Sequence, residues 1–408
     1  MTVTLADIQA AAELIKGAVL HTPIIPAPRL SQAFGADVYL KLENLQVTGS
    51  FKPRGALNRL QALDQAAGRR GVVAMSAGNH AQGVAYHAQR LGIPATIVMP
   101  RGTPFSKIER TEALGARIVL EGESLSEAGV AARRLAEAEG LTFVHPYDDP
   151  LVVAGQGTVA LEMLADIPDL DDLLVPIGGG GLIAGIAVAA KALKPGIRVF
   201  GVQAELYPSM VQVLAGDPPR ASGPTLAEGI AVKSPGTLTR ALIAEWVDDI
   251  LLVDEAAIEE SVLTLIEDCR LVAEGAGAVT LAALARHRAR FEGRKVGLVV
   301  SGGNIDCRVL ASILLRGLTR GGRLARLRVE ITDLPGALAK VSQVIAECGG
   351  NIIEIYHQRL FHDVPVKLAE IDAMVETTGA RHVHLIVERL HAAGFPARVL
   401  TNTSDGEG

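Results

Sequence analysis

Apolar and polar residues along the first 318 positions follow a pattern that predicts strands and helices in alternation. Aliphatic and β-branched runs at residues 38–42, 71–77 and 94–100 are bounded by glycine, proline or polar residues, as buried strands are. Apolar residues three and four positions apart predict helices at residues 81–91 and 151–164. Strands that alternate with helices are typical of parallel sheets covered by helices, so the pattern predicts an α/β fold.

This α/β part divides into two series of elements, which we interpret as two domains with a cleft between them. Residues 38–145 form a small domain, with a helix expected at about residues 53–67. Residues 1–37 and 146–318 form a large domain, in which one long helical stretch follows a strand at residues 249–254.

The pattern changes after residue 318. Residues 319–324 are rich in glycine and arginine and are typical of a linker. Residues 325–402 then predict the order strand, helix, strand, strand, helix, strand, which is the ferredoxin-like α+β arrangement. Residues 403–408 are polar and are expected to form a frayed tail.

Composition narrows the class of protein. Of 408 residues, 49% are hydrophobic, and the net charge of -6 comes without an arginine-rich cluster, so a nucleic-acid partner is not expected. No apolar run reaches membrane-spanning length, and residues 1–20 resemble an amphipathic helix more than a signal peptide. Three widely spaced cysteines, an odd number, favour free thiols in a reducing cytoplasm: Cys269, Cys307 and Cys348.

Lys52 is the first candidate for chemistry, because it lies between Phe51 and Pro53 directly after a polar turn. A flexible, solvated lysine needs no such surroundings. A lysine that acts as a nucleophile does, because partial removal of water lowers its pKa and frees the amine. The alternative, a surface lysine with no special role, stays open on this segment alone.

Four successive glycines, Gly178 to Gly181, follow a buried-strand pattern and precede a helix. Backbone N–H groups at such a helix start can bind a phosphate. Gly179, Gly181 and Ala184 also match a dinucleotide-binding pattern, with Glu205 at the end of the next strand. A loop that serves only tight packing is the third interpretation.

Two further polar turns follow predicted strands. The turn from Ser76 to His80 begins a helix, so its N–H groups can bind a carboxylate and the Asn79 amide can donate to a ligand oxygen. An ordinary helix cap explains it equally well. Ser301 begins the sequence Ser-Gly-Gly-Asn at the end of a strand, where α/β ligands bind, although an ordinary turn is the alternative. No zinc motif and no G-x-S-x-G motif is present, and we expect no metal site.

The four motifs together resemble a known family. SFKPRGA around Lys52, SAGNHAQG from Ser76, GGGGL from Gly178 and SGGN from Ser301 are similar, in this order and spacing, to fold-type II pyridoxal-phosphate enzymes. The resemblance covers about residues 5–318 and is strongest to the threonine/serine dehydratase group, also called threonine ammonia-lyases. It argues against the dinucleotide interpretation, which leaves the other three motifs unexplained.

The resemblance implies a fold of two α/β domains with parallel sheets flanked by helices, and it assigns roles to the motifs. Lys52 would bind pyridoxal 5'-phosphate covalently and move the substrate's α-proton. The cofactor would also be bound by Phe51, Asn79, Gly178, Gly179, Gly180, Gly181, Leu182 and Ser301. The substrate carboxylate would be bound by Ser76, Ala77, Gly78, Asn79 and His80. A neutral serine at the ring nitrogen favours loss of the β-hydroxyl over transamination.

The implied reaction is the conversion of L-threonine to 2-oxobutanoate and ammonia, with L-serine to pyruvate as a side activity. Serine racemases of the family have a second serine where this chain has Ala77, so we favour elimination over racemisation. A racemase or a 3-hydroxyaspartate dehydratase on the same scaffold is the alternative. A non-catalytic amino-acid sensor or a dinucleotide-binding oxidoreductase is less favoured. Some relatives have a metal ligand at the position of Glu205, but the second carboxylate is missing here.

Residues 325–402 resemble an ACT regulatory domain, with DLPG at residues 333–336 and GGNI at residues 349–352. The resemblance implies an amino-acid effector at Asp333 and Asn351 between paired domains. For threonine ammonia-lyases it implies control by isoleucine or valine, a role in isoleucine biosynthesis, and a dimer or tetramer. In the alternative, the domain only pairs subunits.

Overall fold

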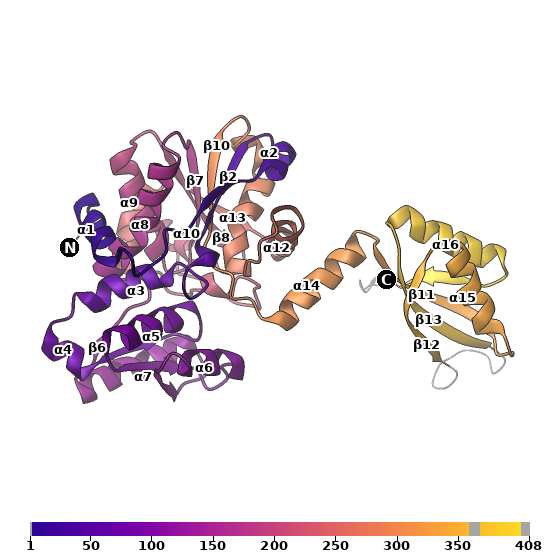
Figure 1. Ribbon diagram of the computed structural model, residues 1–408, viewed down its shortest axis with the longest axis horizontal. Helices are drawn as coiled ribbons and strands as arrows, with labels where there is room; N and C mark the ends of the chain where they lie inside the picture. The colour runs from indigo at the N-terminus through magenta and orange to yellow at the C-terminus, as the bar shows by residue number, and fades with distance from the viewer. Residues whose placement is uncertain (1, 359–367, 401–408) are drawn as a thin grey trace. The chain divides into compact units, whose positions relative to one another are not determined.

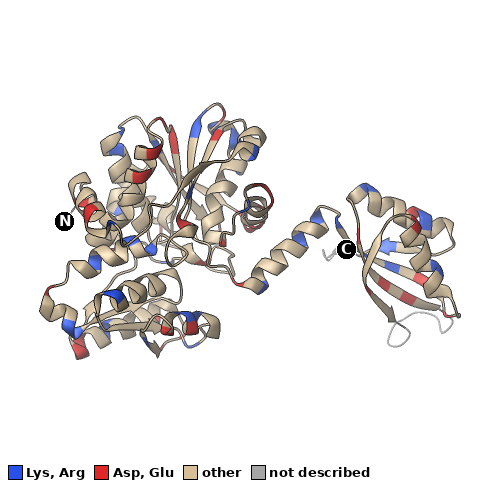
Figure 2. Ribbon diagram, viewed as in Figure 1, with Lys and Arg blue, Asp and Glu red and all other residues tan. Residues whose placement is uncertain are grey.

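The computed structural model describes residues 2–358 and 368–400. The chain divides into two compact units, Met1–Ile305 and Asp306–Gly408, and each is described by itself (Figure 1). Lys and Arg are interspersed with Asp and Glu in both units (Figure 2). In the described part of the chain, none of the helices combines the length and the apolar composition that crossing a membrane requires. The expected tail, residues 403–408, lies outside the described residues.

The first unit contains a six-stranded sheet with the order β1-β2-β10-β7-β8-β9. All neighbours are parallel except β1 and β2. The strands are β1 Ile24–Pro26, β2 Asp37–Leu42, β7 Asp172–Pro176, β8 Arg198–Ala204, β9 Asp249–Val253 and β10 Lys295–Val300. Strand β2 pairs with β10, so the run at residues 38–42 belongs to this sheet and not to the small domain in which we expected it.

Helices cover both faces of the six-stranded sheet, as a parallel sheet requires (Figure 1). One face is covered by α1 Leu5–Ile15, α8 Pro150–Asp166, α9 Gly181–Leu193, α10 Ser209–Leu214 and α11 Thr237–Trp246. The other is covered by α2 Pro28–Phe34, α12 Glu255–Cys269 and α13 Gly275–Arg286. Three short 3₁₀ helices are η1 Glu43–Leu45, η2 Glu228–Ile230 and η3 Arg288–Arg290. The long helical stretch expected after residue 254 is thus two helices with a break at residues 270–274.

A second, four-stranded parallel sheet has the order β5-β4-β3-β6. Its strands are β3 Val72–Met75, β4 Ala95–Met99, β5 Arg117–Leu120 and β6 Thr142–Phe143. Its helices are α3 Lys52–Gln61, α4 Gln65–Arg70, α5 Asn79–Leu91, α6 Phe105–Glu112 and α7 Leu125–Glu139. Alternate residues of β3 pack on opposite faces: Val72 faces the core with α3 and α5, and Val73 faces α7. The helix expected at residues 53–67 ends at Gln61, and Asp64 caps the separate helix α4.

The second unit confirms the expected ferredoxin-like order. Its antiparallel sheet has the order β12-β13-β11-β14, and the helices α15 and α16 contribute to its core. The elements are α14 Cys307–Arg320, β11 Leu324–Thr332, α15 Ala337–Glu347, β12 Asn351–Gln358, β13 Leu368–Glu376, α16 Ala380–Ala392 and β14 Ala397–Val399. The expected linker is shorter than residues 319–324, because α14 continues to Arg320 and β11 begins at Leu324, which leaves residues 321–323 as the connection.

Candidate active site

The predicted motifs follow the carboxyl ends of strands in both parallel sheets, which is where α/β folds bind ligands. Ser301 follows β10, and the glycine run follows β7 in the six-stranded sheet. The turn from Ser76 to His80 follows β3 in the four-stranded sheet. Lys52 is the first residue of α3, which contacts both α5 and α8. The fold therefore places helix starts and strand ends from both sheets around one site.

The segment before Lys52 is attached to the turn at Ser301, far along the chain. Ser50 forms an antiparallel bridge with Gly302. The Phe51 N–H donates to the Ser301 carbonyl at 3.1 Å. The structure therefore brings the SFKPRGA and SGGN motifs together.

The amine of Lys52 is partly shielded from water and is held by a hydrogen bond. Its Nζ donates to the carbonyl oxygen of Pro146 at 3.0 Å and lies 5.0 Å from the centre of the Phe51 ring. Removal of water lowers the pKa of Lys52 to about 8, although the charge of Glu274 opposes this shift. A lysine with this pKa supplies a free amine close to neutral pH, as a nucleophile or general base requires.

The glycine run lies at the start of α9 and presents backbone atoms without side chains. Gly180 has a φ of 98°, which favours glycine, and the Thr239 hydroxyl donates to the Gly179 carbonyl at 2.6 Å. A methyl group on Gly179 would lie 2.2 Å from ring atoms of Tyr147. Leu182, the second residue of α9, is buried. The first N–H groups of a helix have no partner within it, so this surface suits an anion.

The turn after β3 places Ser76 and Ala77 ahead of Gly78, which caps α5. The Ser76 hydroxyl accepts a hydrogen bond from the Gly78 N–H at 3.1 Å, which fixes the turn. His80 is buried, and its Nε2 donates to the carbonyl oxygen of Val144 at 3.1 Å. Burial, together with the positive charge of Lys52, lowers the pKa of His80 to about 3. His80 is therefore neutral and brings no positive charge to a carboxylate.

The sequence motifs did not single out Glu274, which meets Asn79 in the site. Asn79 Nδ2 donates to Glu274 Oε1 at 2.7 Å. Removal of water raises the pKa of Glu274 to about 7, while the hydrogen bond from Asn79 opposes this. Glu274 lies in the unexpected break between α12 and α13, where Arg270 has a φ of 60°. The glycines at positions 275 and 277 were the only signal in the sequence.

Ser301 is buried beside this pair, and its hydroxyl donates to the carbonyl oxygen of Ala276 at 3.2 Å. The single proton of a hydroxyl can rotate from one acceptor to another, so Ser301 can donate to a neutral ring nitrogen without placing a charge there. Asn304, at the end of the same motif, also contacts Asn79.

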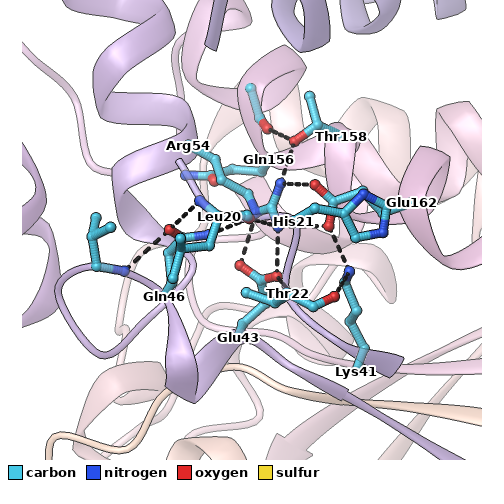
Figure 3. A network of polar contacts seen from close by, with 12 residues as sticks. Leu20, His21, Thr22, Lys41, Glu43, Gln46, Arg54, Gln156, Thr158 and Glu162 are labelled. Atoms are coloured by element: carbon cyan, nitrogen blue, oxygen red, sulfur yellow. Dashed lines mark hydrogen bonds and ion pairs between the residues drawn. The ribbon is translucent and has the colours of Figure 1, made fainter. Parts of the chain in front are cut away.

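A buried network of charges holds α3 in position (Figure 3). The Arg54 guanidinium is fully buried and donates to both oxygens of Glu43 at 2.8 Å and to Glu162 Oε1 at 2.6 Å. Lys41 Nζ contacts Glu162 Oε2 at 2.5 Å. Burial alone would raise the pKa of Glu43, but Arg54 outweighs burial and lowers it. The network joins β2, η1 and α8 to the helix that begins at Lys52.

The proposed effector residues lie in the second unit, at opposite ends of its sheet. Asp333 follows the end of β11, where Thr332 pairs with Leu368. Asn351 begins β12 at the other end and donates from Nδ2 to Glu376 at 3.0 Å. One copy of this unit therefore does not bring the two residues together.

The residues of the site fit a phosphorylated ring bound to a lysine. The glycine surface suits the phosphate, Asn79 and Ser301 supply neutral polar groups, and Lys52 supplies the amine. The described part of the chain has no group of three or more His, Cys, Asp or Glu side chains placed to bind a metal ion. Two helix-covered parallel sheets with these groups between them define the class of lysine-dependent α/β enzymes that use such a cofactor.

Comparison with known proteins gives the family. The chain belongs to the pyridoxal-phosphate dependent enzymes, whose family model matches residues 15–302. It is 46% identical to the L-threonine ammonia-lyase of Thermotoga maritima, over 98% of this chain and all of that protein. The structure of threonine deaminase isoform 2 from Solanum lycopersicum, in its processed form, has a TM-score of 0.72 and 36% identity, over 77% of this chain and 87% of that one. The structure of maize serine racemase has a TM-score of 0.72 and 34% identity, over 78% of this chain and 99% of that one.

The comparisons confirm the expected fold, the pyridoxal-phosphate cofactor and the enzyme class. The dinucleotide-binding interpretation of Gly179 and Glu205 is not needed. The individual roles of the site residues stay predictions.

Proposed function

We propose that this chain is a threonine ammonia-lyase, which converts L-threonine to 2-oxobutanoate and ammonia and L-serine to pyruvate as a side activity. The Lys52 amine carries this proposal, because its lowered pKa and its place between the two sheets suit a group that exchanges protons with a substrate. Similarity to threonine ammonia-lyases along nearly the whole chain supports it. The 2-oxobutanoate would serve isoleucine biosynthesis in the cytoplasm.

In this proposal the residues of the chain have separate tasks. Bound pyridoxal phosphate supplies an electron sink that acidifies the α-carbon of the amino acid. The Lys52 amine removes the α-proton, and the Pro146 carbonyl restrains where that amine can lie. The start of α5 attracts the substrate carboxylate through its N–H groups. The α-proton and the β-hydroxyl are lost together as one water, and hydrolysis of the released enamine consumes one water and gives 2-oxobutanoate and ammonia.

Ala77 supports elimination over racemisation. Racemisation requires a group that returns a proton to the opposite face of the α-carbon, and a methyl side chain has no exchangeable proton. Serine racemases are among the similar structures, so D-serine is the product to look for. We expect 2-oxobutanoate from L-threonine and no measurable D-serine from L-serine.

The test compares the wild-type chain with Lys52→Ala in the presence of pyridoxal phosphate. We expect borohydride to fix the cofactor on Lys52 in the wild type, and Lys52→Ala to lose at least about 10³-fold in 2-oxobutanoate formation. Lys16→Ala is the matched control, because that exposed lysine pairs with exposed Glu13. A Lys52→Ala protein that makes 2-oxobutanoate at the wild-type rate would refute the proposal.

We further propose that a branched-chain amino acid regulates the enzyme at the ACT-like unit. Asp333 and Asn351 lie at opposite ends of strands about 30 Å long, so one small ligand cannot contact both in one copy. A site that uses Asp333 of one copy and Asn351 of another would need a homo-oligomer. Leu334 and Ile353, beside the two turns, are 65% and 53% exposed, which suits an apolar ligand or a second copy.

The regulation is tested by measuring 2-oxobutanoate formation with and without isoleucine and valine. We expect Asp333→Ala and Asn351→Ala each to weaken the response at least about fivefold, in line with ordinary coupling energies, with little change in the rate without effector. An undiminished response in both variants would contradict this site.

A further inference from the structure

Asn79 is the middle of a chain of hydrogen bonds that can run in only one direction. Asn304 Nδ2 donates to the carbonyl oxygen of Thr48 at 2.8 Å and to Asn79 Oδ1 at 2.8 Å. Asn79 Nδ2 donates to Glu274 Oε1 at 2.7 Å. A backbone carbonyl only accepts, so the Thr48 carbonyl fixes Nδ2 of Asn304 as the donor, and the Asn79 atom that faces it must be oxygen. The other side of the Asn79 amide is therefore nitrogen, and it donates to Glu274.

Glu274 is placed at a helix start but does not cap the helix. It is the N-cap residue of α13, where a side-chain oxygen commonly accepts from the first backbone N–H groups. Its carboxylate makes no such bond and contacts Asn79 instead. The Glu274 N–H is bound to the Gly302 carbonyl at 3.1 Å, so the backbone of this residue is also fixed.

Two glycines of the motifs leave room for this series of hydrogen bonds. A methyl group on Gly302 would lie 2.5 Å from Glu274 Oε1 and 3.2 Å from Asn79 Nδ2. A methyl group on Gly49 would lie 2.7 Å from Asn304 Oδ1. Any larger residue at either position would displace these polar side chains, and Gly49 in addition has a φ of 71°, which favours glycine.

We propose that Glu274 and Asn304 are positioning residues that hold the Asn79 amide in one orientation, so that its second N–H faces the cofactor ring. The inference rests on the proposed function, in which Asn79 donates to the ring hydroxyl. An amide nitrogen has two protons, and Glu274 takes one of them. Without its two neighbours the amide can rotate and present its oxygen to the ring hydroxyl.

The test measures how tightly the full-length apoenzyme binds pyridoxal phosphate and which absorption spectrum results. Glu274→Met removes the acceptor at similar side-chain length, and we expect about 10-fold weaker binding and a changed absorption maximum. Glu274→Gln keeps an accepting oxygen without the charge, and we expect binding within about threefold of the wild type. Near wild-type binding by Glu274→Gln would show that Glu274 orients Asn79 by accepting a hydrogen bond and does not act through its charge.

A second carboxylate at a helix start gives the matched control. Glu255 accepts from the Thr225 hydroxyl at 2.6 Å and from the Leu226 N–H at 2.7 Å, but it does not contact Asn79. Glu255→Met should lower the unfolding temperature while the affinity for pyridoxal phosphate and the spectrum stay as in the wild type. Asn304→Asp removes both donors at unchanged size, and we expect it to reproduce the loss of Glu274→Met.

The outcomes separate this inference from the proposed function. If Glu274→Met and Asn304→Asp both bind pyridoxal phosphate about as tightly as the wild type, with its spectrum, the inference is overturned. If Glu274→Met does not fold, the affinity of Asn304→Asp for pyridoxal phosphate and its absorption spectrum test the inference. A wild type that binds the cofactor but makes no 2-oxobutanoate from threonine refutes the proposed function, and the binding data still decide this inference.

Discussion

At the scale of single residues, Lys52 is distinguished by the loss of water around its amine. The pKa of Lys52 is lowered to about 8, so the amine is protonated below pH 8 and free above it. We expect the rate at which pyridoxal phosphate attaches to the apoenzyme to rise with pH and to level off just above about pH 8. Stopped-flow absorbance measures this rate, and a rate that still rises steeply at about pH 10 would indicate an ordinary lysine.

Gly179 gives the second prediction at this scale. Gly179→Ala would place a methyl group against the ring of Tyr147, and the backbone of the phosphate-binding surface would have to move. We expect at least about 10-fold weaker binding of pyridoxal phosphate, equal to about 1.4 kcal/mol. Gly196→Ala is the control, because no atom lies within 4 Å of the added methyl group. Equal affinity of the two variants in a fluorescence titration would show that the surface tolerates a side chain.

At the scale of elements, the buried network around Arg54 decides how α3 is attached. Arg54→Met would leave the fully buried Glu43 and the partly buried Glu162 with only Lys41 as a positive partner. Removing one partner from a buried ion pair costs about 3–5 kcal/mol, and we expect this loss in the free energy of unfolding of the first unit. Urea unfolding followed by circular dichroism measures it.

The matched control for this network is Arg134→Met. Arg134 pairs with Glu121 at 2.6 Å, but its side chain is 71% exposed, so the pair adds little to stability. We expect the unfolding midpoint of this variant to stay close to that of the wild type. Equal losses in the two variants would mean that the buried network does not hold α3 in place.

At the scale of the whole molecule, the two units have separate hydrophobic cores. Ile371 is fully buried in β13, and Ile371→Ala should destabilise the second unit by about 2–5 kcal/mol. We expect calorimetry to show a lower melting temperature for one transition only, with little change in 2-oxobutanoate formation. Leu385→Ala, at a position that is 42% exposed, is the control. A shift of both transitions would show that the two units unfold together.

The motifs could be recognised in the sequence because each follows an apolar segment that forms a strand. Glycine and serine directly after a buried run mark the edge of a parallel sheet where ligands bind, and this applied to Ser76, Gly178 and Ser301. The ferredoxin-like order of the second unit was readable for a similar reason, since local periodicity separates its strands from its helices.

Contacts between residues that are distant in the sequence could not be predicted from it. Glu274 meets Asn79 across 195 positions, and the break that places it was expected to be helix. Strand β2 pairs with β10, so the strand before Lys52 lies in the large sheet and not in the small domain. The periodicity of apolar residues indicates which face of a helix or strand is buried. The order of strands in a sheet depends on pairing between distant segments.

The sequence by itself determined the α/β class, the ferredoxin-like unit, and a lysine, a glycine run and polar turns that suit pyridoxal phosphate. These features depend on local spacing and on residue chemistry, which a single chain displays directly. Only the tertiary structure decided that Arg54 is buried between two carboxylates and that Glu274 and Asn304 enclose Asn79. Burial and pairing set the pKa and the orientation of a side chain, and both arise only when distant segments pack together.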